Sequence, residues 1–516
     1  MVSSKLAVLA CLAITACGQG AIEQQPGNGD AGTTDGGDAA PLPDGSSCQA
    51  ADCAELGHEC GIWDDGCGGE LDCGPCQAEG VTDSLSQHGI TWHFAAEVPY
   101  GRFVTGDYWV QGPITVTAVE PGATSSNGWQ LNGSMLNPPN GRQAYDSRTT
   151  HWNVGYHEDY RAHFPLDIEP DASLVSTISR EPFDEPLRPA LQTAAVLTVL
   201  SEPPRPGSFR PGLIGEDKYM FNYHDIRWDR LPGLAVTASA PDPIALAGRF
   251  ERPWLLHGAG WTHRHIMPLE NSPSYHQDVA RLLSHAAVVL SSDIADIEEL
   301  VVNYLQVAID YYTMQQSPGE GAYNYFWPIV FAGIMFDRAD MRSMWTQGSH
   351  NSPEYHQHKV YFGSIRSQGS AVFGEEGILS RTGVLLGGPS SFDEQDTWTG
   401  YYARTGERPV FYSPGTGDTD GHEELHPSEW DALQQNAPNT YKRMHSVSMV
   451  GFSFASWAFE ALDSVHIEAY VPYTIRWMYE DESIIHDSYG PTGGAHPYAT
   501  SRSDFVDEMW HTHWNF

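Results

Sequence analysis

The cysteines are confined to the first 76 residues of this 516-residue chain, so its two parts must be stabilised in different ways. An even number of cysteines in so short a stretch predicts a small, loop-rich unit over residues 48–76 with three disulfides. The sequence leaves their connectivity open, and a zinc site is disfavoured because no second Cys-x-x-Cys pair faces the one present. The remainder must fold around a hydrophobic core and cannot use a cysteine nucleophile. The six clustered cysteines are Cys48, Cys53, Cys60, Cys67, Cys73 and Cys76.

The N-terminus has the pattern of an export signal. Lys5 precedes a short apolar run that is too short to span a bilayer. The run ends in Ile14-Thr15-Ala16-Cys17, which resembles a bacterial lipobox. That resemblance implies a lipoprotein signal peptide over residues 1–17 and lipidation of Cys17. The alternative is an ordinary secretory signal, so we expect a protein that is exported and either lipid-anchored at the outer membrane or cell surface, or secreted.

Residues 18–47 are rich in Gly, Asp, Pro and Thr, and no basic residue occurs between Lys5 and Arg102. Such a stretch cannot bury apolar surface, which predicts a disordered tether. The whole chain has 27 Lys+Arg against 66 Asp+Glu, a net charge of -39. This balance argues against nucleic acid as a partner. No later run is apolar enough to span a membrane, so we expect membrane contact only through the lipid anchor.

Residues 88–205 have the pattern of a β-rich domain. Runs rich in β-branched and aromatic residues alternate with Gly- and Asn-rich turns, which predicts a β-sandwich-like domain. The proline-rich segment 203–207 marks its end. The predicted strands cover residues 89–94, 108–119, 173–179 and 192–200.

Residues 206–516 change to helical periodicity after about residue 250. Helical hairpins of this kind predict an (α/α) toroid-like domain, interrupted by a loop or strand insertion at 347–430. We expect one helix to open at Asp293 and the apolar run 326–336 to form a buried inner helix. Further helices are predicted over 441–462, 467–480 and 504–513. The expected fold class is therefore multidomain α+β.

Two loops of the β-rich region combine the residue types that bind sugars in proteins. Aromatic rings stack on sugar faces, whereas amides, carboxylates and guanidinium groups bind hydroxyls. The alternative is a purely structural role, in which the Asn-Gly and Asp-Ser pairs in these loops only form turns. With one tyrosine of the helical half, the predicted substrate-binding residues are Asp107, Trp109, Asn137, Tyr145, Arg148 and Tyr325.

The densest polar run of the helical half lies between His257 and His276. Eliminative cleavage of a uronate polymer needs a group that neutralises the carboxylate, a base for the C5 proton and an acid for the leaving oxygen. Arg or Asn can serve for the first, and Tyr or His for the others. A second cluster lies at residues 422–445. The predicted catalytic residues are His257, Arg264, His265, Tyr275, Tyr441 and His445.

Aromatic segments such as Arg252-Pro-Trp254, Trp327-Pro-Ile-Val-Phe-Ala-Gly333 and Phe505-Val-Asp-Glu-Met-Trp510 resemble a poorly characterised family of exported bacterial lipoproteins. Members of that family pair a β domain with a helical toroid and are similar to polysaccharide lyases. The resemblance implies a carbohydrate-active enzyme acting on an acidic polysaccharide. The motifs of α/β-hydrolases, zincins, P-loop NTPases and dinucleotide enzymes are missing from the sequence.

Two other functions stay open. A glycoside hydrolase would use paired carboxylates, and a surface lipoprotein could bind glycans without catalysis. No cofactor is required, although His-x-His pairs at 263–265, 356–358 and 511–513 are compatible with a structural divalent metal. These pairs would place two imidazoles on one side of a strand. The candidate carboxylates are Asp107, Glu375, Glu376, Glu424 and Glu429.

Overall fold

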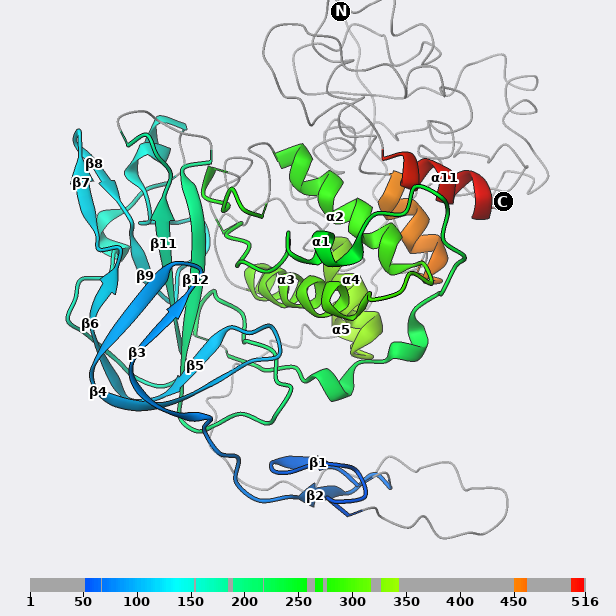
Figure 1. Cartoon of the computed structure of the whole chain (residues 1–516), viewed down its shortest axis with the longest axis horizontal. Helices are drawn as coiled ribbons and strands as arrows, with labels where there is room; N and C mark the ends of the chain where they lie inside the picture. Colours follow the sequence, from blue (N-terminus) through cyan, green and yellow to red (C-terminus); the bar gives the residue numbers. More distant parts are fainter. Residues whose placement is uncertain are drawn as a thin grey trace, which may run out of the picture.

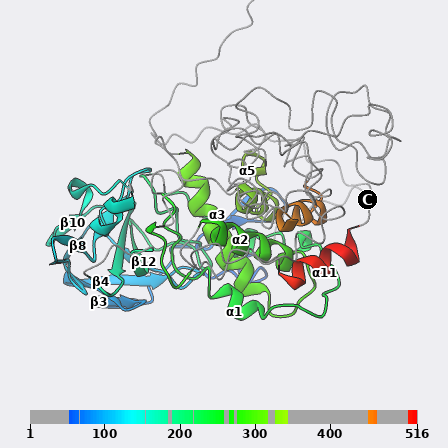
Figure 2. The ribbon, with the colours of Figure 1, turned by 90° about the horizontal axis from the view of Figure 1, so that it is seen from above.

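The computed structural model describes residues 52–65, 67–152, 155–183, 189–216, 218–257, 265–271, 276–316, 326–342, 450–461 and 503–514. Within these residues the chain forms a curled β-sheet, a group of helices beside it and a small disulfide-bonded module (Figure 1). Seen from above, the sheet and the helices lie side by side, and helix α11 (Asp504–His513) is on the side away from the sheet (Figure 2). The chain is therefore an α+β protein.

The main sheet has eight strands in the order β10-β6-β4-β5-β12-β11-β9, with β3 pairing β4. Among the described strands, β12 and β5 are the one parallel pair of this sheet, and all its other pairs are antiparallel. A two-stranded ribbon pairs β7 with β8, and short 3₁₀ turns lie at Ser147–Trp152, Glu158–Tyr160, Tyr223–Asp225 and Trp228–Arg230. The strands are β3 (Gly80–Gln87), β4 (Ile90–Arg102), β5 (Tyr108–Gln111), β6 (Ile114–Glu120), β7 (Thr124–Ser126), β8 (Trp129–Leu131), β9 (Ser134–Leu136), β10 (Leu166–Ile168), β11 (Ala172–Ser179) and β12 (Leu191–Leu200).

Strands β11 and β12 are buried almost throughout because both of their faces are covered. Leu174 and Leu197 face a core enclosed by the curled sheet. Val175 and Val196, each one residue along, face a second core shared with the helices. The alternation along each strand thus divides its side chains between two cores.

The predicted sandwich is not confirmed, because the eight strands belong to one hydrogen-bonded sheet. The strand predicted over 108–119 is two strands, β5 and β6, separated at Gly112-Pro113, where proline has no N–H for the ladder. Strand β3 lies before the predicted boundary at residue 88 and pairs with β4. The sheet therefore begins at Gly80.

The helices beside the sheet confirm several expected elements. The inner helix predicted over 326–336 is α4, and α11 has the predicted bounds. Residues 450–458 are helical within the range predicted to be 441–462, whereas the helix predicted over 467–480 and the insertion 347–430 lie outside the described residues. The toroid stays a prediction. The helices are α1 (Pro243–Ala247), α2 (His276–Leu290), α3 (Glu298–Gln316), α4 (Phe326–Met335) and α5 (Ala339–Arg342).

The helix expected to open at Asp293 begins instead at Glu298. Asp293 makes long-range contacts: its N–H donates to Leu234 O, and its carboxylate accepts from the N–H of Val236. Asp296, expected within the first turn, has a φ of 58°, which is left-handed and incompatible with a helix interior. The prediction was wrong because these contacts compete with the local capping signal.

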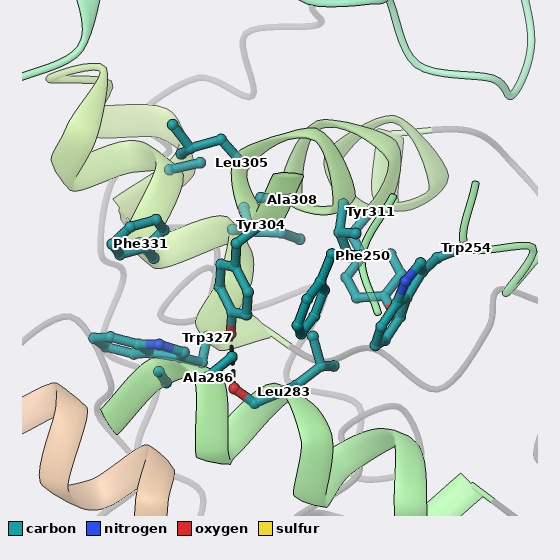
Figure 3. Close-up of a cluster of buried hydrophobic side chains, with 14 of the residues drawn as sticks. Phe250, Trp254, Leu283, Ala286, Tyr304, Leu305, Ala308, Tyr311, Trp327 and Phe331 are labelled. Carbon is teal, nitrogen blue, oxygen red and sulfur yellow. Dashed lines mark hydrogen bonds between the residues drawn. The ribbon is translucent and has the colours of Figure 1, made fainter. Parts of the chain in front are cut away.

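The helical core is built from aromatic rings that α3 and α4 contribute together with the segment before α2 (Figure 3). Phe250 and Trp254 stack with ring centroids 5.0 Å apart and 6° between planes. The hydroxyl of Tyr304 points down to α2 and donates to Leu283 O at 3.1 Å. A buried tyrosine needs such a partner, so this bond fixes α3 against α2.

The same core reaches across the predicted domain boundary at residues 205–206. It includes Met135 and Tyr145 from the β half together with α2, α3 and α4. The described parts of the two halves are therefore joined by continuous apolar packing.

The cysteine-rich module contains the hairpin β1 (Ile62–Asp64) and β2 (Glu70–Asp72). Disulfides join Cys53 to Cys73 and Cys60 to Cys76. Cys67 is also disulfide-bonded, but its partner is not among the described cysteines, and Cys48 lies outside the described residues. Because Cys73 and Cys76 belong to different disulfides, the Cys-x-x-Cys pair is not a redox or zinc motif.

Candidate functional site

The structure brings together two residues that the sequence predicts separately, Tyr145 and His257. Tyr145 Oη and His257 Nε2 share a hydrogen bond at 3.3 Å, and the rings meet edge to face. The two residues are 112 positions apart, and both side chains are fully buried. Burial raises the pKa of Tyr145 well above its ordinary value, because the phenolate would lose its hydration. The pair thus joins a neutral phenol to an imidazole, the two groups that exchange protons in acid–base catalysis.

Backbone contacts fix both members of the pair. The N–H of Gly141 donates to His257 O at 2.6 Å, and the N–H of Gly133 donates to Tyr145 O at 2.8 Å. Gly133 is needed for its lack of a side chain, since a Cβ there would lie 2.2 Å from Ala144 O. The close approach of these two backbone segments places the tyrosine ring.

Asn140 directly precedes Gly141, and the sequence predicts it only as part of a turn. Its side chain is buried, and Nδ2 donates to Met314 O at the end of α3. Its Oδ1 has no hydrogen-bond partner in the described part of the chain. Such an acceptor is costly to bury and needs an explanation. The Asn140-Gly141 pair was the only signal that could have marked it in the sequence.

His265 is also fully buried, at the far end of the segment that starts at His257. Its carbonyl accepts from the N–H of Ala190, beside the first residue of β12. The backbones of both histidines are therefore attached to the β half. The other four predicted catalytic residues lie outside the described residues, namely Arg264, Tyr275, Tyr441 and His445. The predicted substrate-binding residue Tyr325 also lies outside them.

Three predicted substrate-binding residues have packing or ion-pairing roles instead. Asp107 is 3% exposed, and its Oδ2 accepts from Arg210 Nε at 2.9 Å. Trp109 is 3% exposed and lies against Gly101, where a Cβ would be 2.4 Å from the indole. Arg148 is fully buried and donates to both carboxylate oxygens of Asp146. None of the three presents a free face to a substrate, because their polar atoms or rings are already engaged.

Asn137 likewise has a structural role, at the end of β9. Its N–H donates to Ser173 O at 2.9 Å, and its Oδ1 accepts from the N–H of Ser173 at 2.8 Å. With a φ of 42°, Asn137 occupies the left-handed region that asparagine tolerates. A purely structural role as a turn residue therefore accounts for Asn137.

The structure gives no support to the metal alternative within the described residues, which contain no group of three or more potential ligands. His511 and His513 lie two apart on helix α11, so they point in different directions and not to one side of a strand. His513 Nε2 instead lies 2.7 Å from Ala235 O. No described helix is both long and apolar enough to cross a membrane.

Comparisons with family models, curated proteins and solved structures gave no match to this chain. The resemblance to exported lyase-like lipoproteins therefore stays a prediction, and the function must be argued from the site itself.

Proposed function

We propose that the protein is an exported carbohydrate-active enzyme that cleaves an acidic, uronate-containing polysaccharide by β-elimination. The observation that carries the proposal is the hydrogen bond between Tyr145 Oη and His257 Nε2. The proposal includes the fold expected from the sequence, a sandwich-like β domain beside an (α/α) toroid, and lipid anchoring through Cys17.

In this reaction one member of the pair accepts the C5 proton of the uronate. The electron pair of that C–H bond forms the C4–C5 double bond, and the bond between C4 and the glycosidic oxygen breaks. The leaving oxygen takes a proton from the other member of the pair. Tyr145 is assigned the role of acid because burial keeps its phenol protonated, and the His257 imidazole, which is hydrogen-bonded to it, is assigned the role of base. The proton lost and the proton gained balance within the pair.

The hydrolase alternative has weaker support. Of its candidate carboxylates, the structure describes only Asp107, which is buried in an ion pair with Arg210. Both carboxylate oxygens of Asp107 already accept hydrogen bonds, from Gln87, Thr105 and Arg210, and its charge is compensated by the arginine, so it is held in a structural ion pair. The remaining candidates, Glu375, Glu376, Glu424 and Glu429, lie outside the described residues.

The test is product formation on a panel of acidic and neutral polysaccharides, followed by the ultraviolet absorbance of the unsaturated sugar. Tyr145→Phe and His257→Gln should each lower turnover by about 100- to 10,000-fold while the circular dichroism spectrum is kept. Tyr160→Phe is the matched control, because Tyr160 is 44% exposed. Turnover within tenfold of wild type in both variants contradicts the proposal. Saturated reducing ends indicate a hydrolase, and binding without cleavage indicates a glycan-binding lipoprotein.

A further inference from the structure

The cysteine-rich module is held against the rest of the protein by a contact built around one tryptophan. The guanidinium group of Arg205, which follows β12, lies over the Trp63 ring at 4.6 Å, and its Nη1 donates to Ile62 O at 2.9 Å. Within the module His58 stacks on Trp63 with ring centroids 3.7 Å apart, and His224 meets the indole edge to face from outside the module. The module is therefore a fixed part of the described structure and can form one wall of a binding site.

A cleft of about 1130 Å³ lies between this module and one end of the sheet, and we call it the module cleft. Residues 61–62, 72 and 74–76 of the module form one wall. The opposite wall includes Val81 of β3, Pro99 of β4, Gln111 of β5 and Leu200 of β12. The volume is above the range of about 300–1,000 Å³ that is usual for small-molecule sites. The module cleft is therefore large enough for an extended segment of a polymer.

Both walls expose aliphatic side chains to the cleft. Ile62 of the module is 53% exposed, and Val81 of β3 is 62% exposed. Met220 adds a side chain that adapts its shape to a partner. Large apolar side chains that stay exposed around one cleft mark an interaction surface. No aromatic ring lines the cleft among the described residues, so the stacking platform of a sugar site is missing here.

The charges that line the module cleft are mostly negative. Asp72 belongs to the module, whereas Asp171 and Glu202 belong to the opposite side, and all three residues are exposed. Arg205 is the one cation among the described lining residues, and it is already paired with Asp225 at 3.6 Å. A cleft lined by one sign of charge attracts a ligand of the opposite sign. The expected ligand is therefore positively charged.

The three carboxylates do not converge on one point. The residues that the structure describes contain no group of three or more side chains that could hold a metal ion. A single small cation would also leave most of the cleft unfilled. Separate negative charges beside aliphatic side chains instead match a peptide that mixes lysine or arginine with aliphatic residues.

The chain does not supply such a segment beside the cleft. Residues 18–47 directly precede the module, but no basic residue occurs between Lys5 and Arg102. The net charge of -39 likewise disfavours a second copy of the chain as the occupant. The expected occupant is therefore a segment of a different protein.

We infer that the module cleft binds an extended peptide segment of a partner protein, rich in basic and aliphatic residues. The inference does not rest on the proposed function, because the cleft and the Tyr145–His257 pair share no residue. It gives the cysteine-rich module a role in binding, since the module supplies one wall and one of the three carboxylates.

The test is the binding of labelled peptide pools to the full-length protein, followed by fluorescence anisotropy. The first pool mixes Lys and Arg with Leu and Val, the second has Glu in place of the basic residues, and the third has Ser in place of the aliphatic residues. We expect the first pool to bind about tenfold or more tightly than either of the others. Its affinity should fall as the salt concentration rises, because exposed charges are screened.

Variants of the lining residues locate the binding. The double variant Asp171→Asn/Glu202→Gln should weaken binding of the first pool about fivefold, because two exposed ion pairs are lost. Asparagine suits position 171, where φ is 64°. Val81→Ser should weaken binding about tenfold through lost apolar contact. Glu169→Gln is the control, because Glu169 is an exposed carboxylate two residues before Asp171 that does not line the cleft.

The changed positions are exposed, so all these variants should keep the wild-type circular dichroism spectrum. Weaker binding in the double variant and in Val81→Ser, with unchanged binding in Glu169→Gln, supports the inference. Equal affinity for the three pools overturns it, as does wild-type affinity in either cleft variant. Chitosan oligomers test for a basic sugar polymer instead, and their binding without any binding of the first peptide pool also overturns the inference.

Discussion

The sheet contacts the helical half through two polar clusters, and the two are built in opposite ways. In the first, Arg210 is held between Asp107, directly before strand β5, and Asp310 of α3, with N–O distances of 2.9 and 2.7 Å. In the second, Tyr145 and His257 share one hydrogen bond, and the nearby Asn140 Oδ1 has no partner in the described residues. Both clusters are buried, but only the first is an ion-pair network, in which the charges of Arg210, Asp107 and Asp310 compensate one another.

The difference indicates a division of roles. Arg210 also donates to Pro211 O, and its own carbonyl accepts from Gln306 of α3. Burial alone would lower the pKa of Arg210, but the charges of Asp310 and Asp107 outweigh it and raise the pKa. Such a cluster fixes α3 against the sheet. A buried acceptor without a partner in the described residues, such as Asn140 Oδ1, adds no comparable stability, and such groups are found where a protein binds or reacts with something else.

The largest effect should follow from breaking the compensated cluster. Asp310→Ala leaves Arg210 buried with one counter-ion fewer, which should lower the free energy of unfolding by about 3–5 kcal/mol. Asp229→Ala is the control, because Asp229 forms an exposed pair with Arg227 and should cost less than about 1 kcal/mol. Urea denaturation followed by fluorescence measures both. A cost for Asp310→Ala as small as that of the control would mean that the cluster does not hold the two halves together.

The next effect is a loss of stability at low pH, and it arises from one histidine of the helical half, His285 of α2. Burial, together with the charge of Arg281, lowers the pKa of His285 to about 4, from 6.5 in the unfolded chain. The unfolded state therefore takes up the proton first, and stability falls as the pH drops from about 6.5 to 4. The full loss is about 3 kcal/mol.

His285→Leu should remove this component, because leucine keeps the apolar contact with Phe505 without a titrating group. The measurement is the difference in unfolding free energy between pH 7 and pH 4 for wild type and variant. His163→Leu, at an exposed position, is the control. An equal acid loss in wild type and His285→Leu would contradict the assignment to His285.

The sequence predicts those elements whose signal is local. Strands β11 and β12 and helices α4 and α11 follow from apolar runs or helical periodicity that nothing distant overrides. The prediction that a helix starts at Asp293 was wrong, because hydrogen bonds of Asp293 with Leu234 and Val236 compete with helix capping. Likewise, each strand of the sheet was recognisable, but the curl that joins them into one sheet depends on pairings between distant strands.

The site was predictable residue by residue, but not as an arrangement. Tyr145 and His257 were each expected from their chemistry, yet nothing in the sequence pairs positions 112 residues apart. Asp107 and Arg148 were mistaken for substrate ligands because a polar loop residue and a buried ion pair look the same in sequence. A usable signal was overlooked in α3, where Asn303, Gln306 and Asp310 share one face and all are buried.

The smallest effect should come from the cluster that we assign to function. Tyr145→Phe removes the hydroxyl that bonds His257 but keeps the ring, which packs in the core shared by both halves. Because one neutral hydrogen bond contributes about 1 kcal/mol, the variant should lose about that much unfolding free energy, well below the loss for Asp310→Ala. Tyr304→Phe is the matched control, since its buried hydroxyl also makes a single hydrogen bond, to Leu283 O. Both variants should be equally stable by urea denaturation, whereas only Tyr145→Phe should lose turnover. If Tyr145→Phe is destabilised as strongly as Asp310→Ala, the pair is a structural contact and the two clusters do not differ in role.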